Sequence, residues 1–226
     1  MYQTCATSGC SRRTKGFSKH CGSCGKRNAR HGHPLQETIS KGDLAPYRRS
    51  VRNFLNSRTD RDAWTKAADR LAVLTEQATT YIAAYQGGTA VNRWQLQAYR
   101  MILRVIEDAA TTTVIETVAG MALYRCREPR RFRSDEAFLT QMTRRFVGLT
   151  DQNAGTYYSH ALGRTVRVYR DTPPRTAVIL GRLLMETIGV ISLVQHRQEV
   201  ERQRAERQAS QALFDALVEG GEHVAR

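Results

Sequence analysis

Apolar residues recur at helical spacing through most of the chain after Gly42. In the first such stripe the apolar residues fall on one face of the predicted helix and arginines fall on its other faces. The stripe comprises Leu44, Tyr47, Val51, Phe54 and Leu55. Spacings of three and four residues are typical of a helix that buries one face. Similar stripes lead up to the Gly87-Gly88 pair, begin again near Val91, and begin again after Ser134. The pattern therefore predicts a mainly α fold.

Capping residues mark where some of these helices begin. Asp60 and Ser134 carry side-chain oxygens just before an apolar stripe, as N-cap residues do. Thr172 has the same place before the last helix, with Pro173 at its first helical position. That helix is expected to run to Gly220-Gly221, which is about 70 Å at 1.5 Å per residue. Its second half is highly charged, so we expect it to project and to form a homo-oligomer or bind a protein partner.

Two segments depart from the helical pattern. The run "TTTVIETVAG", residues 111–120, is rich in β-branched residues but is too long and too isolated for a strand. In "TYYSHALGRTVRVYR", residues 156–170, polar and apolar residues alternate around Val166, and Gly163 supplies a turn. This predicts a short β-hairpin. A helix followed by a basic hairpin is also the order of elements in a winged helix, where the helix enters the major groove.

Charge divides the chain unevenly. Lys and Arg number 35 against 21 Asp and Glu, a net charge of +14. No acidic residue precedes Glu37, and the first 36 residues supply seven of the net positive charges. We therefore expect three parts: a module at 1–36, a basic helical domain at 37–172 with the hairpin near 156–170, and the long helix at 173–226. The excess of cations predicts attraction to polyanions, first nucleic acid and then anionic membranes.

The most apolar stretch runs from Ala177 to Val194. Arg182 and Glu186 interrupt it, whereas a spanning helix needs roughly 20 mostly apolar residues without charges at mid-depth. A buried helix is expected instead. The first ten residues lack the basic flank and apolar block of a signal peptide. The expectation is an intracellular, cytoplasmic protein with no membrane partner.

Four of the five cysteines lie in the first 36 residues, spaced Cys5-x4-Cys10-x10-Cys21-x2-Cys24. Two thiolate pairs joined by a loop can surround one tetrahedral Zn²⁺. His20 is a candidate substitute ligand, although it adjoins Cys21. The alternatives are four unrelated thiols or a Cys-x-x-Cys redox pair, for which the surrounding strand–helix context is missing. The spacing favours a zinc site.

The segment "CATSGC…GFSKHCGSCGKRNARHGHP" resembles a small treble-clef-like zinc finger found in proteins of phages and other bacterial mobile elements, including some homing-type nucleases. The resemblance covers about residues 1–36. It implies that Cys5, Cys10, Cys21 and Cys24 bind zinc and that Lys26 to Arg30 form a basic helix, which His31-Gly32-His33-Pro34 ends. Cys24 stands where that pattern often has His, and the central loop is slightly longer. The resemblance further implies nucleic-acid binding in a mobile-element setting.

Basic residues form two clusters that could contact nucleic acid, one in the first 36 residues and one around residues 130–167. Arginine predominates in the second cluster, and arginine suits bidentate contacts to phosphate or guanine. The alternative is the solvated face of a basic helical protein. The candidate contact residues are Arg12, Arg13, Lys15, Lys26, Arg27, Arg30, Arg130, Arg131, Arg133, Arg144, Arg145, Arg164 and Arg167.

No residue set argues for an enzyme. His31 and His33 flank a glycine and precede Pro34, whereas relaxase and replication-initiator nucleases place a hydrophobic residue between two histidines on a strand. An HNH nuclease needs a further histidine and asparagine set, which nothing downstream supplies. For a tyrosine recombinase, His160 is followed by Arg164, one position too far. A phosphate-binding Gly-rich loop with Lys-Ser/Thr is missing as well.

These patterns together predict a non-enzymatic, zinc-containing DNA-binding protein, an accessory or regulatory factor of a phage or mobile genetic element. Zn²⁺ is the expected cofactor and DNA the expected partner. One alternative is a protein–protein adaptor that recruits a nucleic-acid enzyme. RNA binding is another.

Overall fold

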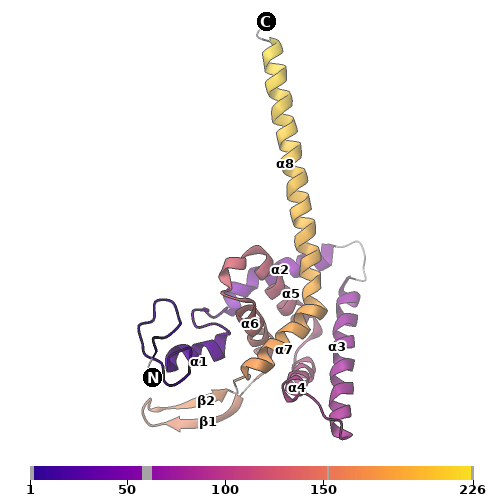
Figure 1. Cartoon of the computed structure of the whole chain (residues 1–226). Helices are drawn as coiled ribbons and strands as arrows, with labels where there is room; N and C mark the ends of the chain where they lie inside the picture. Colours follow the sequence, from indigo (N-terminus) through magenta and orange to yellow (C-terminus); the bar gives the residue numbers. More distant parts are fainter. Residues whose placement is uncertain (1–2, 58–62, 152, 170, 225–226) are drawn as a thin grey trace.

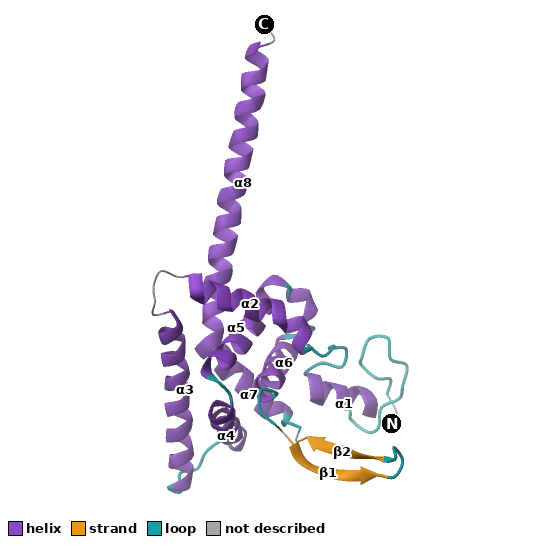
Figure 2. Ribbon diagram, turned by 180° about the vertical axis from the view of Figure 1, so that it is seen from behind, coloured by secondary structure: helices purple, strands orange, loops and turns teal. Residues whose placement is uncertain are grey.

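The computed structural model of the chain describes residues 3–57, 63–151, 153–169 and 171–224 (Figure 1). The chain is mainly α, with a two-stranded antiparallel hairpin and a long C-terminal helix, as the periodicity predicts (Figure 2). The α-helices are α1 Gly22–His31, α2 Lys41–Ser57, α3 Ala63–Gln86, α4 Arg93–Asp108, α5 Thr111–Arg127, α6 Asp135–Val147, α7 Pro174–Leu184 and α8 Val190–Val224. The strands are β1 Asn153–Ser159 and β2 Arg164–Tyr169, and two short segments are the 3-10 turn η1 Pro129–Arg131 and the π-helical η2 Met185–Gly189.

Helix α5 is the centre of the core. All its residues from Val114 to Tyr124 are buried, and α2, α6, α8 and η2 pack around it. The β-branched run that shows no helical period thus belongs to a helix. Its side chains are covered on every side, so no polar face marks it in the sequence.

Several predicted helix boundaries are confirmed. Helix α4 begins at Arg93, close to the predicted start near Val91, and Ser134 caps α6 as predicted. The structure adds Asn92 as the cap of α4, where its side chain accepts hydrogen bonds from two backbone N–H groups. Helix α3 ends at Gln86, directly before the Gly87-Gly88 pair. Asp60 lies outside the described residues.

The last helix differs from the expectation at both ends. Its N-cap is Pro173 rather than Thr172, and α7 begins at Pro174. Segment η2 joins α7 to α8, which continues through Gly220-Gly221 to Val224. The expected stop at the glycine pair is wrong. Glycine in an established helix costs about 1 kcal/mol, which is too little to end it.

The first turns of α8 pack on the body, and the remainder projects. Ser192 Oγ donates a hydrogen bond to the Ala119 carbonyl oxygen of α5, and Glu199 forms an ion pair with Arg127 at 2.6 Å. Beyond that point residues 201–214 are all exposed. Figure 1 shows α8 extending well away from the other helices. The projection expected from the charge pattern is therefore present.

One helix among the described residues is long and apolar enough to cross a membrane. It is Pro174–Phe214, with a mean hydropathy of 1.9 in its most apolar window, and 39% of that window is buried inside the fold. Ala177, Leu180, Leu184 and Ile188 are buried there, against α4, α5 and α6. Core helices of soluble proteins have the same length and composition, so the finding is weak evidence for a membrane span.

The hairpin predicted for residues 156–170 is present. Strands β1 and β2 pair antiparallel with Thr156 opposite Arg167, and Gly163 in the turn has a φ of +59°. Helix α6 precedes the hairpin, but its fully exposed residues are the acidic Asp135 and Glu136. The order of elements expected for a winged helix is thus present, but no basic residue of α6 is fully exposed.

Candidate metal centre and cationic clefts

The first cysteine pair lies on a tight loop that an antiparallel bridge closes. The N–H of Cys10 donates to the Thr7 carbonyl oxygen at 3.0 Å. Gly9, next to Cys10, has a φ of +74°, a conformation that favours glycine over residues with a side chain. The loop carries the thiols of Cys5 and Cys10 toward the same point.

The second pair is placed by the start of α1. Cys21 is the N-cap residue of α1, and Cys24 lies in the first turn. The N–H of Gly25 donates to the Cys21 carbonyl oxygen at 2.8 Å and so closes that turn. Thiolates at a helix N-terminus are stabilised by the helix dipole.

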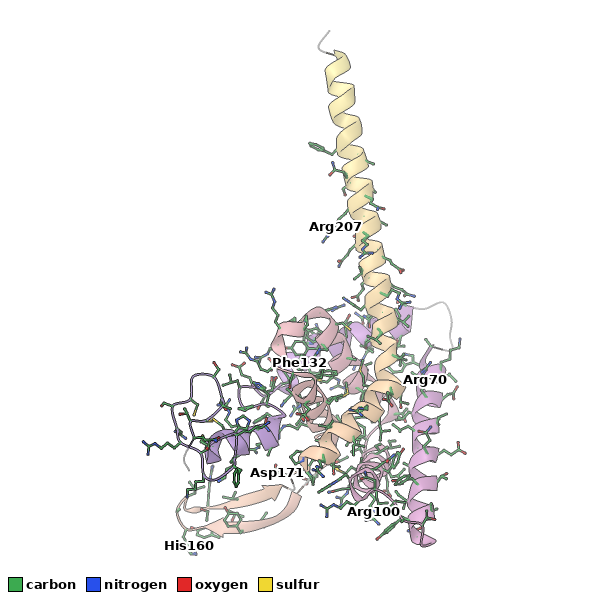
Figure 3. The ribbon with its side chains drawn as sticks, in the orientation of Figure 1. Arg70, Arg100, Phe132, His160, Asp171 and Arg207 are labelled. Carbon is green, nitrogen blue, oxygen red and sulfur yellow. The ribbon has the colours of Figure 1, made fainter. Side chains whose placement is uncertain are left out.

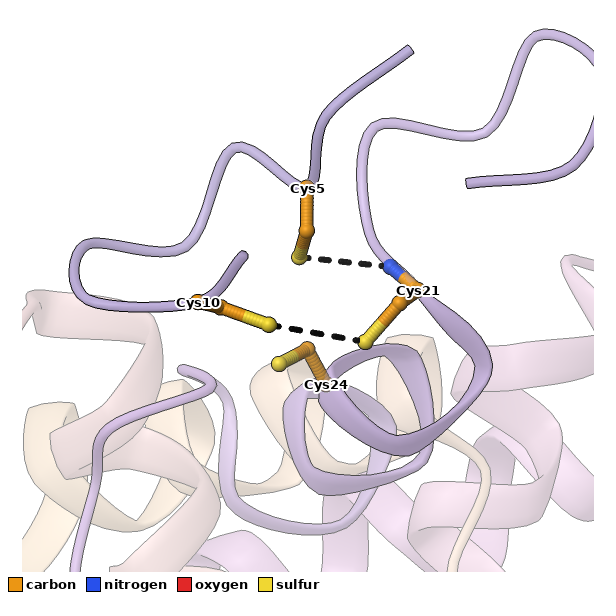
Figure 4. A group of neighbouring side chains, drawn as sticks. All are labelled: Cys5, Cys10, Cys21 and Cys24. Carbon is orange, nitrogen blue, oxygen red and sulfur yellow. Dashed lines mark hydrogen bonds between the residues drawn. The ribbon is translucent and has the colours of Figure 1, made fainter. Parts of the chain in front are cut away.

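The four thiols meet in a cluster that fits one tetrahedral metal ion (Figure 4). All four sulfur atoms lie within 4.8 Å of one another, and Cys10 Sγ is 3.9 Å from Cys21 Sγ. A tetrahedral site with Zn–S bonds near 2.3 Å places its sulfurs about 3.8 Å apart. A disulfide would need about 2.05 Å, and all four cysteines are free. The residues therefore form a zinc-finger-like site, as the spacing predicts.

Polar neighbours favour the thiolate form of two of these cysteines. The Thr7 hydroxyl and the Cys21 N–H lie 3.4 and 3.3 Å from Cys5 Sγ, and they lower the pKa of the Cys5 thiol to about 5. The N–H of Cys24 likewise lowers the pKa of Cys21. His20 lies beside the four-cysteine cluster without belonging to it, and its Nδ1 forms a hydrogen bond with the Thr7 hydroxyl at 3.1 Å.

The His31-Gly32-His33-Pro34 segment ends α1 and fastens it to the body. Gly32 is the C-cap with a φ of +77°. A Cβ there would lie 2.6 Å from the Glu136 carbonyl oxygen of α6. Gln141 of α6 is fully buried, with its Nε2 3.2 Å from His31 Nδ1 and its Oε1 accepting from the Ile39 N–H. The end of α1 at this segment agrees with the sequence prediction, whereas its docking on α6 was not predicted.

The predicted nucleic-acid contact residues differ in solvent exposure and in whether they form ion pairs. Most are exposed, namely Arg12, Arg13, Lys15, Lys26, Arg27, Arg30, Arg130, Arg133 and Arg164. Arg131 is half-buried and forms an ion pair with Glu37, which lowers the pKa of Glu37. The Arg167 side chain lies outside the described residues.

The structure brings four of these cations to one place. Lys26 and Arg30 of α1 and Arg144 and Arg145 of α6 line the same cleft, whose volume is about 960 Å³. The predicted cluster at 130–133 is not among its lining residues. The cleft arises because α1 docks beside α6, which no local pattern encodes.

A second cleft carries cations that the sequence reasoning missed. Arg93, Arg100 and Arg104 of α4 line a groove of about 720 Å³. Their spacings of seven and four residues place them on one helix face, so the signal is present in the sequence. The apolar stripe of the same helix is the stronger pattern, and it obscures the regular spacing of the three arginines.

No family model, no curated protein and no solved structure matches the chain.

Proposed function

We propose that this protein is a zinc-containing DNA-binding accessory or regulatory factor that acts without catalysis. The observation that carries the proposal is the four-cysteine cluster, which joins the N-terminal loop to the start of the basic helix α1, while Gly32 and His31 dock the end of that helix on α6. Zinc fingers commonly use such a site to present a helix to nucleic acid. The phage or mobile-element setting rests on the resemblance of residues 1–36 alone.

Zn²⁺ bound by Cys5, Cys10, Cys21 and Cys24 would have a structural role. When bound it supplies four strong bonds and leaves no open coordination position for chemistry. The segment has little else to hold it, because the continuous hydrophobic core of the protein begins at Ile39. Metal-binding free energy thereby becomes folding free energy for this part of the chain.

Exposed cations supply the affinity for DNA in this proposal. Six candidate cations on residues 3–36 are exposed, and no acidic residue lies among them. Neutralising phosphates with Lys and Arg releases counterions, so affinity falls steeply with salt. RNA carries the same phosphates and would share this electrostatic contribution, which leaves RNA as the alternative ligand.

Two measurements test the proposal. Metal analysis of the purified protein should return about one zinc per chain, and Cys126→Ser should leave that content unchanged. A DNA duplex and a single strand titrated at two salt concentrations should both show binding that weakens as salt rises. Absence of binding to either at low salt would contradict the DNA-binding function, and absence of zinc would contradict the metal site.

A second candidate function is that of a protein–protein adaptor, and the projecting part of α8 favours it. Residues 201–214 are all exposed, and Leu213 and Phe214 are 65% and 62% exposed near the far end. Large apolar side chains on a projecting helix suit pairing with a second copy of the chain or with another helix. Sedimentation of the wild type against Leu213→Lys/Phe214→Lys would test self-association, with a dimer expected only for the wild type.

A further inference from the structure

Two cationic clefts adjoin on the molecule and form one track. The inter-module cleft is the space between α1, α6 and the start of α7. Its charged lining is Lys26, Arg30, Lys41, Arg144 and Arg145 together with Asp151 and Asp171. The α4 groove is lined by Arg93, Arg100 and Arg104. Val147, Asp171 and Thr172 line both clefts, so the two clefts adjoin. Figure 3 shows Asp171 and Arg100 in the same part of the molecule.

Cations in this track have few counter-charges within the fold. Among the residues that the structure describes, eight basic residues face the track against two acidic ones. Arg144 and Arg145 are half-buried, and neither forms an ion pair with an acidic residue in the part of the chain that the structure describes. The Nε atoms of both are buried without a hydrogen-bond partner. An anion in the cleft would supply the counter-charge that these two guanidinium groups lack.

Like charges also face each other across the inter-module cleft. Arg144 Nη1 donates a hydrogen bond to the Arg30 carbonyl oxygen at 3.4 Å, and this contact brings the Arg144 guanidinium beside the cationic end of α1. Burial, Arg30 and Arg145 lower the pKa of Arg144, so the cations destabilise one another's charged form. Docking of Gly32 and His31 on α6 holds the two arginines in this arrangement. A ligand that brings negative charge would relieve the repulsion.

An aromatic ring is present at the other end of the track. Tyr85 lines the α4 groove and is 46% exposed, with the Arg100 guanidinium 5.5 Å from its ring centre. Positively charged grooves with aromatic platforms are the usual way to hold single-stranded nucleic acid, in which the bases are free to stack. A flat basic face would suit a duplex better.

We propose that the two clefts together hold the phosphodiester backbone of a single DNA strand. The strand runs from Arg30 and Arg144, through the shared region at Asp171 and Thr172, to Arg100 and Arg104. This rests on the proposed DNA-binding function and deepens it, because it names the form of DNA and the surface that holds it.

The test compares one exposed cation at each end of the track with a matched control. Arg30 and Arg104 are exposed, and so is Arg70 of α3, which lines neither cleft. The probe is a fluorescently labelled oligodeoxythymidylate, titrated by anisotropy over a range of salt concentrations. Arg30→Gln and Arg104→Gln should each weaken binding and each lower the slope of log K against log salt by about 0.7. Arg70→Gln should leave the slope unchanged. Circular dichroism of the three variants checks that all are folded.

The outcomes separate the inference from the proposed function. An unlabelled duplex that competes better than the single strand would overturn the single-strand assignment. So would an oligouridylate that binds much more tightly than the DNA strand. If the strand binds but neither Arg30→Gln nor Arg104→Gln changes the slope, the track is wrong and DNA binding stands. If only one of them changes it, the two clefts are not one site. Failure of the wild type to bind any DNA overturns both.

Discussion

Gly32 is the residue at which the finger and the body depend on each other most directly. Its φ of +77° disfavours residues with a side chain, and a Cβ would also meet the Glu136 carbonyl oxygen at 2.6 Å and the Ala137 Cα at 2.8 Å. Backbone atoms cannot move aside as a flexible side chain can. The position therefore combines a conformational requirement with a packing requirement.

Gly32→Ala should destabilise the protein by about 3 kcal/mol, from about 1–2 kcal/mol of left-handed backbone strain and the rest from the collision with α6. Gly16→Ala is the matched control, because Gly16 has a φ of +58° and no atom lies within 4 Å of where its Cβ would be. Gly16→Ala should lower the free energy of unfolding only by the backbone strain, about 1–2 kcal/mol. Urea unfolding of both variants measures the difference, and equal losses would contradict the packing requirement.

Glu116 is a charged residue inside the most buried helix. It is 4% exposed and accepts hydrogen bonds from Arg52 at 2.6 and 2.8 Å and from Arg48 at 3.1 Å. Burial opposes its ionisation, but the two guanidinium groups outweigh that and hold the pKa of Glu116 below its ordinary value. The pair of arginines thereby connects α2 to α5.

Glu116→Gln should destabilise the protein by about 2 kcal/mol at neutral pH, less than for a fully buried pair because Arg52 is half exposed. A lowered pKa stabilises the fold above the ordinary value of 4.5, and this contribution is lost as pH falls through the folded pKa. The loss on mutation should therefore shrink in acid. Glu206→Gln, which removes an exposed pair with Arg202, should change stability by less than about 0.5 kcal/mol. Denaturant unfolding of the wild type and both variants at several pH values measures these differences.

At the scale of elements, the amphipathic periodicity of the sequence predicts α2, α3, α4 and α6, because each of these helices has one face in the core and one in water. Helix α5 was not located, because burial on all sides removes the polar face that creates the period. The predicted end of α8 is wrong because a glycine pair costs an established helix too little to end it. Cysteine spacing did predict the thiol cluster, since four ligands of one ion must lie close together.

The finger and the body should respond differently to loss of metal. Helix α1 is short, ten residues, and the core from Ile39 onward contains none of the four cysteines. Chelation should therefore unfold residues 3–36 while α2 to α8 stay helical. Far-UV circular dichroism should change little, whereas proteolysis should begin to cut between Lys15 and Lys26. Loss of most of the helical signal would contradict this division.

At the scale of the whole molecule, the inter-module cleft could not be predicted from any local pattern. Arg30 and Arg144 are 114 positions apart, and they meet because the cysteine cluster shapes α1 and Gly32 docks its end on α6. The α4 groove, in contrast, belongs to the body alone. One half of the proposed track thus depends on the metal and the other half does not.

This difference makes the two ends of the track separable by experiment. In metal-loaded protein, Arg30→Gln and Arg104→Gln should each weaken binding of a DNA strand. After chelation α1 no longer holds Arg30 beside Arg144, so Arg30→Gln should lose most of its effect, while Arg104→Gln should keep its own. Anisotropy titrations of both variants with and without chelator measure the four changes. An Arg30→Gln effect that persists undiminished without metal would mean that α1 keeps its place by docking alone.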